Sequence, residues 1–183
     1  MGDDLWLVTD LETTGLVPRD HLILEAGVIA ISAKDLSVVE ESETLVRHDK
    51  DHILERLDDT VHAMHTKNGL LADFEHCRGH FVYGHQGLDE WLVAFANRLG
   101  FERGKVILVG NTVHFDRSFL EQHTFTFPTY LHYRHLDVRA MQVAYRAWHG
   151  HHDVLEYEKP HRALPDARRS LETLRFFRDR MAA

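Results

Sequence analysis

Residues 5–16 have the sequence LWLVTDLETTGL, in which an apolar run passes into two acids and a Thr-Thr-Gly turn. The run from Leu5 to Val8 predicts a buried strand. Alternate side chains of a strand share one face, so Asp10 and Glu12 point the same way. Two neighbouring acids favour a bound cation or a shared proton, and Mg²⁺ prefers carboxylate oxygens. A solvated acidic strand end gives the same pattern, so further acids must decide between these interpretations.

Length and composition indicate one globular domain over residues 1–183, since 44% of the chain is hydrophobic and 27% is charged. A net charge of −8 argues against a broad basic surface for long nucleic acid, but it permits a short oligonucleotide held locally. We expect an intracellular, cytoplasmic protein without a membrane segment. The reasons are the lone Cys77, the acidic start of the chain and the absence of a long apolar stretch.

Histidines are unusually frequent, at 16 of 183 residues. A zinc site is one interpretation, but the chain has neither a Cys-x-x-Cys nor a His-Glu-x-x-His motif. We therefore favour surface histidines in polar loops for the three clusters, which are His48/His52, His62/His65 and His149/His151/His152.

The order of expected elements predicts an α/β fold. Three consecutive strands suggest an antiparallel meander, and two later strands alternate with helices. The stretches 47–67, 77–87 and 149–162 are polar or glycine-rich and are expected to be loops, the first with a short helical turn and a further short helix following at 68–75. The expected strands are 5–8, 22–32, 36–46, 106–109 and 136–138, and the expected long helices are 88–99, 114–123, 139–148 and 163–181.

Further acids follow later in the chain. Asp116 stands in the first turn of a helix after the strand end Gly110-Asn111. Asp166 stands near the start of the last helix, five residues after His161. Taken singly, each acid is explained by the favourable interaction of a carboxylate with a helix N-terminus. Glu25, inside the second strand, is best explained as the partner of an arginine or of a backbone donor.

Taken together, these acids match a known pattern. In order and spacing, Asp10-x-Glu12, Asp116, His161 and Asp166 resemble the DEDDh 3′–5′ exonucleases, over about residues 5–178. Within that class the resemblance is strongest to the oligoribonuclease subfamily, whose marker H-Y-R-x-L-D-V matches His132-Tyr133-Arg134-x-Leu136-Asp137-Val138. The resemblance implies a ribonuclease H-like fold with a mixed five-stranded sheet flanked by helices.

The resemblance also implies the chemistry. Two divalent ions, Mg²⁺ or Mn²⁺, would be held by Asp10, Glu12, Asp116 and Asp166, with His161 as general base. Phosphodiester hydrolysis suits these residue types, because two metal ions can stabilise both the attacking and the leaving oxygen. Histidine is the side chain best matched to proton transfer near neutral pH. The expected products are nucleoside 5′-monophosphates.

The substrate contacts are likewise implied by the resemblance. Leu16 would wedge against the terminal bases, Thr112 would lie near the terminal phosphate, and His65 would lie near the substrate. In a homodimer, Tyr133 and Arg134 of one subunit would cap the 5′ phosphate of a very short RNA that is bound to the other subunit. The guanidinium of an arginine can donate two parallel hydrogen bonds to a phosphate. Asp137 is expected to be structural.

Two departures from the subfamily pattern leave the identity of the substrate undecided. Thr13 stands where oligoribonucleases usually carry Met, and the form L-E-T-T-G is commoner in proofreading DNA exonucleases. Thr60 stands where a base-stacking tryptophan is usual. Three hypotheses therefore remain: an exonuclease on short single-stranded RNA, a proofreading-type exonuclease on single-stranded DNA, and a noncatalytic nucleic-acid-binding module. The choice between Mg²⁺ and Mn²⁺ also stays open.

Overall fold

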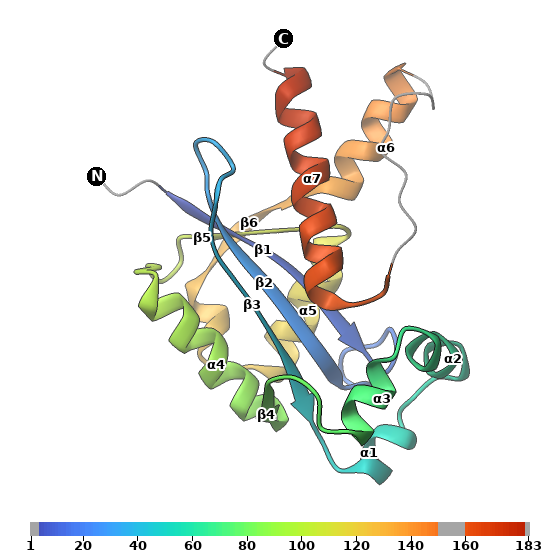
Figure 1. Ribbon diagram of the computed structural model, residues 1–183. Helices are drawn as coiled ribbons and strands as arrows, with labels where there is room; N and C mark the ends of the chain where they lie inside the picture. Colours follow the sequence, from blue (N-terminus) through green and yellow to red (C-terminus); the bar gives the residue numbers. More distant parts are fainter. Residues whose placement is uncertain (1–3, 150–159, 182–183) are drawn as a thin grey trace.

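A computed structural model describes residues 4–149 and 160–181 of the protein. Six strands of these residues form one mixed sheet in the order β4-β3-β2-β1-β5-β6 (Figure 1). The α/β class is therefore confirmed. The strands are β1 Leu5–Thr13, β2 Ile23–Ser32, β3 Val38–Arg47, β4 Phe81–Tyr83, β5 Val106–Gly110 and β6 Leu131–Asp137. The helices are α1 Lys50–Leu54, α2 Asp59–Lys67, α3 Leu70–Glu75, α4 Gly84–Arg98, α5 Val113–His123, the 3-10 helix η1 Phe127–Tyr130, α6 Val138–His149 and α7 Ala163–Met181.

The sheet has the predicted meander followed by parallel strands. β1, β2 and β3 pair antiparallel, whereas β5 pairs parallel to both β1 and β6. β1 is longer than its apolar run, because pairing with β2 continues through Asp10, opposite Gly27, and Glu12, opposite Glu25. The two acids therefore belong to the strand itself, and the ladder holds their backbone.

The sheet has one strand more than the five expected. β4, within the predicted loop 77–87, pairs parallel with the end of β3. It is only three residues long, between Gly79-His80 and Gly84, so its local sequence carries little strand signal. The stretch 47–67 likewise differs from the prediction, because it forms α1 and α2 where a loop with one helical turn was expected.

The two faces of the sheet carry different helices. Leu7 and Leu11 of β1 belong to the core formed with α4 and α5. Val8 points to the opposite face and packs in the core formed with α7. Asp10 and Glu12 have the same parity along the strand as Val8, so their side chains project toward the α7 side of the sheet. This alternation places the acids where the last helix begins.

The start of α7 lies directly against β2. A Cβ atom at Gly27 would be 2.4 Å from the Leu164 backbone nitrogen, so only glycine permits this approach. The expected apolar face of the helix is confirmed, since all four of its members are buried: Ala163, Ala167, Leu171 and Leu174. In Figure 1 this helix stands across the sheet on the face opposite α4. Within residues 4–149 and 160–181, no helix is both long and apolar enough to cross a bilayer.

Candidate active site

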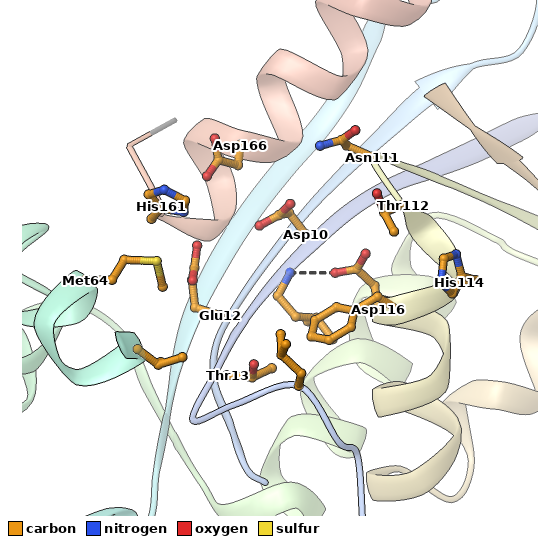
Figure 2. A pocket seen from close by; sticks show the side chains of 14 residues that line it. Asp10, Glu12, Thr13, Met64, Asn111, Thr112, His114, Asp116, His161 and Asp166 are labelled. Atoms are coloured by element: carbon orange, nitrogen blue, oxygen red, sulfur yellow. Dashed lines mark hydrogen bonds between the residues drawn. The ribbon is translucent and has the colours of Figure 1, made fainter. Parts of the chain in front are cut away.

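A cleft of about 320 Å³ lies where the end of β1 meets the starts of α5 and α7. Figure 2 shows its side chains converging from these three elements and from α2. The cleft is lined by seven of the residues predicted from the sequence, which are Asp10, Glu12, Leu16, Thr112, Asp116, His161 and Asp166.

The four acids come from three elements, since Asp10 and Glu12 lie on β1, Asp116 on α5 and Asp166 on α7. Asp116, in the first turn of α5, accepts a hydrogen bond from the Leu11 N–H at 2.9 Å, drawn as a dashed line in Figure 2. Glu12, Asp116 and Asp166 are only 6%, 3% and 5% exposed. Charged carboxylates at such low exposure are costly unless compensated, and a divalent cation provides the strongest compensation.

One group of potential metal ligands stands out among the described residues. Ligand atoms of Glu12, His161 and Asp166 all lie within 4.8 Å of one another. Asp10 and Asp116 line the same cleft. A set of hard carboxylate oxygens with one imidazole suits Mg²⁺ or Mn²⁺ better than a thiolate-rich site would.

The turn between β5 and α5 has a strained backbone. Thr112 has a φ of 66°, which is unfavourable for a β-branched residue. Its N–H donates to the Asp137 carboxylate at 3.1 Å, and the same oxygen accepts from the N–H groups of Arg139 and Ala140. Asp137 therefore anchors Thr112 and caps the first turn of α6, which is the structural role expected for it.

The turn after β1 presents Leu16 at the mouth of the cleft, where its side chain is 72% exposed. Thr13 Oγ1 donates to the Gly15 carbonyl at 2.7 Å, and the Leu22 N–H donates to Thr14 Oγ1 at 2.9 Å. Gly15 leaves no room for a side chain, because a Cβ would lie 2.3 Å from the His21 ring. A rigid turn thus holds an apolar side chain out toward solvent.

His65 lies beside Glu12 but is fully buried. The sequence predicted a substrate contact, but its ring is 0% exposed. His65 Nε2 lies 3.0 Å from the Thr13 carbonyl oxygen and 3.9 Å from a Glu12 carboxylate oxygen. Burial lowers the pKa of the His65 imidazole. His65 therefore supports the end of β1 from beside Glu12, and its place near the substrate stays a prediction.

Tyr133 and Arg134 lie outside the cleft. They belong to the edge strand β6, where the Tyr133 side chain is 70% exposed. The Arg134 guanidinium lies 5.0 Å from the centre of the Tyr133 ring. Neither residue is among those that line the cleft of its own chain.

The cleft has apolar walls that the sequence analysis did not identify. Val61 and Met64, one turn apart on α2, face Phe115 of α5 across the cleft opening. A signal was present, because Val61 and Met64 are apolar at helical spacing within an otherwise polar stretch. Thr60, where a tryptophan was expected, is exposed and does not line the cleft.

The histidines are less exposed than predicted. His48, His85 and His123, here called the histidine stack, have ring centres 4.7 Å and 3.9 Å apart with His85 in the middle. Burial and the neighbouring rings lower the pKa of His85 to about 3, and burial also lowers the pKa values of the other two. Among the clustered histidines, the surface prediction is wrong for the half-buried His48 and the buried His65, whereas His52, His62 and His149 are exposed as predicted. His151 and His152 lie outside the described residues.

Solved structures share this architecture. Escherichia coli exonuclease I bound to a 5cy-dA13 oligonucleotide matches 96% of this chain and 40% of its own, with a TM-score of 0.64 and 12% identity. A zinc-bound exonuclease I–ssDNA complex has a TM-score of 0.64 and 15% identity over 97% of this chain and 41% of its own. The chain thus spans about two fifths of the length of these structures, and at such identity the likeness establishes the fold. The protein has the ribonuclease H-like fold of exonucleases.

The sequence relatives are more specific. The family model described as Exonuclease, RNase T, matches residues 7–174, and the chain belongs to this family. It is 33% identical over 169 residues to a probable oligoribonuclease of Dictyostelium discoideum, covering 92% of this chain and 86% of the relative. It is 33% identical over 177 residues to an oligoribonuclease of Vibrio cholerae, covering 95% and 92%.

Proposed function

We propose that this protein is a 3′–5′ exoribonuclease that hydrolyses short single-stranded RNA to nucleoside 5′-monophosphates with the help of two divalent metal ions. The observation that carries the proposal is the convergence of Asp10, Glu12, Asp116, Asp166 and His161 on one cleft. The family match and the oligoribonuclease relatives support the same activity.

The donor set fits the ions. Asp10, Glu12, Asp116 and Asp166 would hold Mg²⁺ or Mn²⁺, and three of these acids are nearly buried. When bound, the ions supply positive charge that stabilises the attacking and leaving oxygens of the phosphodiester. The hydrogen bond from the Leu11 N–H fixes one carboxylate oxygen of Asp116 and so limits the directions in which it can bind a cation.

We propose His161 as the general base. Its ring lies between Glu12 and Asp166 at the cleft wall (Figure 2). We assign it the proton of the attacking water, whose oxygen bonds to phosphorus while the bond from phosphorus to the 3′ oxygen breaks. The leaving 3′ oxygen takes up a proton from solvent, His161 later returns its proton to solvent, and the released terminal nucleotide keeps the phosphate on its 5′ oxygen.

The rim of the cleft suits the terminal base and phosphate. Leu16 projects from a rigid turn, and Val61, Met64 and Phe115 add apolar surface against which a base can pack. Thr112 would bind near the terminal phosphate, since its turn is anchored by Asp137. We expect Leu16 and Thr112 to determine how the 3′ end is seated.

We further propose that the enzyme acts as a homodimer. Tyr133 and Arg134 are exposed on an edge strand and do not line their own cleft, so they would cap the 5′ phosphate of a short RNA bound to the partner chain. A dimer in analytical ultracentrifugation supports this arrangement. A stable monomer that degrades dinucleotides at full rate would contradict it.

The location we propose is the cytoplasm. The one cysteine, Cys77, is a free thiol at the surface, which fits a reducing compartment. RNA degradation is the process in which such an enzyme would act.

A second candidate substrate is single-stranded DNA. The exonuclease I structures that share the fold hold DNA oligonucleotides, and Thr13 gives the turn a form common in proofreading enzymes. The test compares a 5′-labelled dinucleotide RNA with a single-stranded DNA of about twenty nucleotides, a length that exceeds the cleft. Faster cleavage of the dinucleotide supports the first proposal. Preference for the DNA, degraded as a ladder from its 3′ end, would overturn the substrate but keep the reaction.

A further inference from the structure

His161 has an unusual backbone conformation. Its φ is 52°, in the left-handed region that residues with a side chain rarely adopt. It lies two residues before the start of α7, so no helical hydrogen-bond ladder holds it. A strained residue at a functional site keeps its conformation only when surrounding contacts enforce it. Contacts with neighbouring residues must therefore hold His161 in this conformation.

The contact on the His161 backbone comes from Asn68, between α2 and α3. Asn68 Nδ2 donates a short hydrogen bond to the His161 carbonyl oxygen. The same amide nitrogen lies 3.3 Å from His65 Nδ1, and Asn68 Oδ1 accepts from the Leu70 N–H at 2.9 Å. Every polar group of this side chain is thus engaged, and its orientation is determined by its neighbours.

The donor and acceptor roles follow from the partners. The Thr13 carbonyl can only accept, so His65 Nε2 carries the proton and donates to it. His65 Nδ1 is then the acceptor in the neutral ring and receives one hydrogen of the Asn68 amide. A continuous chain of hydrogen bonds runs from β1, beside Glu12, through His65 and Asn68 to the backbone of His161.

We propose that Asn68 is a positioning residue for the general base. It ties the His161 backbone to the strand that carries Asp10 and Glu12, so that the base and these acids keep their relative positions. The inference rests on the proposed role of His161. Asn68 does not line the cleft, and it would act through His161 without touching the substrate.

A separate contact holds the residue that follows. The Arg162 guanidinium binds Glu25 at 2.8 Å and Asp73 at 2.9 Å, which fastens the chain just after His161. That ion-pair group stabilises the start of α7 with or without Asn68. Loss of Asn68 should therefore leave the fold and Asp166 in place and loosen mainly the base.

The test is steady-state kinetics of Asn68→Asp and Asn68→Ala on a dinucleotide RNA with Mn²⁺. Asp has the shape of Asn and can still accept from the Leu70 N–H, but its carboxylate donates to neither His161 nor His65. We expect kcat to fall about tenfold or more, within the range that general-base catalysis contributes, with KM unchanged. Asn97→Ala is the matched control, because Asn97 accepts from the Tyr130 hydroxyl far from the cleft.

The decisive comparison uses His161→Ala as background. If Asn68 acts through the base, Asn68→Ala lowers kcat in the wild-type chain and has no further effect once His161 is replaced. An equal loss in both backgrounds, or a wild-type kcat in both Asn68 variants, would overturn the inference. A wild-type kcat in His161→Ala alone would instead overturn the proposed base.

A readout independent of activity is hydrogen exchange in the metal-free protein. We expect the amides of residues 161–163 to exchange faster in Asn68→Ala than in wild type or Asn97→Ala. Unchanged exchange there would contradict the anchoring role.

Discussion

Replacing Arg162 with Met should destabilise the protein by about 3 kcal/mol, because it breaks a buried ion pair from one side. The guanidinium makes three hydrogen bonds of 2.8–3.1 Å to Glu25 and an ion pair with Asp73 at 2.9 Å. Glu25 is 2% exposed, so the variant leaves its carboxylate buried without the guanidinium, although the Ala163 N–H still donates to it.

The magnitude follows from the burial of each partner. Removing one member of a buried pair typically costs about 3–5 kcal/mol. The Arg162 side chain is 26% exposed, which lets water reach part of the site and places the cost at the lower end. For a domain of this size, each kcal/mol lowers the melting temperature by roughly 2–4 °C. We therefore expect a decrease of about 6–12 °C.

The assay is urea denaturation followed by circular dichroism, with Arg168→Met as matched control. Arg168 pairs with Glu41, but these side chains are 51% and 36% exposed, and such pairs contribute about 0–1 kcal/mol. The double variant Glu25→Gln with Arg162→Met should recover part of the loss, since no unpaired charge stays buried. Equal effects of Arg162→Met and Arg168→Met would refute the reasoning.

Three further predictions concern other parts of the molecule. Gly27→Ala should destabilise the fold by about 1–3 kcal/mol in a thermal melt, because its methyl group would meet the backbone of α7. The pKa values of the histidine stack in the folded protein lie below the ordinary 6.5, because burial disfavours the protonated rings. The free energy of unfolding should therefore be highest above about pH 6.5 and decrease as the pH is lowered toward about 3. In urea denaturation, the stability of His85→Phe should depend less on pH. Leu16→Ala should raise KM for a dinucleotide while leaving the melting temperature unchanged, since the side chain is 72% exposed.

The main helices and strands could be predicted because their apolar residues recur with the spacing of a helix or of a strand. α7 begins and ends where its pattern predicts, at Ala163 and Met181. β4 escaped prediction because its three residues become a strand only through pairing with β3. α2 escaped because its mean composition is polar and its few apolar side chains face the cleft. In both cases tertiary contacts supply what the local sequence lacks.

The acids of the site could be predicted from motif order and strand parity, which need no knowledge of packing. The supporting contacts could not, because they join residues far apart in the chain. His65 lies 52 positions from Thr13, and Asn68 lies 93 positions from His161. Burial of the His65 ring depends on how α2 packs against the end of β1, so the sequence could place it near the site without showing that the ring is covered.

The central claim is that the acid-lined cleft releases nucleotides from the 3′ end of RNA with divalent ions. The most direct measurement is the yield of nucleoside 5′-monophosphate from a dinucleotide RNA, for wild type and Asp116→Asn, with Mn²⁺ and with EDTA. Asn keeps an acceptor for the Leu11 N–H, so the variant should fold normally. We predict rapid release by wild type with Mn²⁺, none with EDTA, and a loss of at least about 100-fold in Asp116→Asn. Full activity of Asp116→Asn, or release that persists in EDTA, would contradict the account.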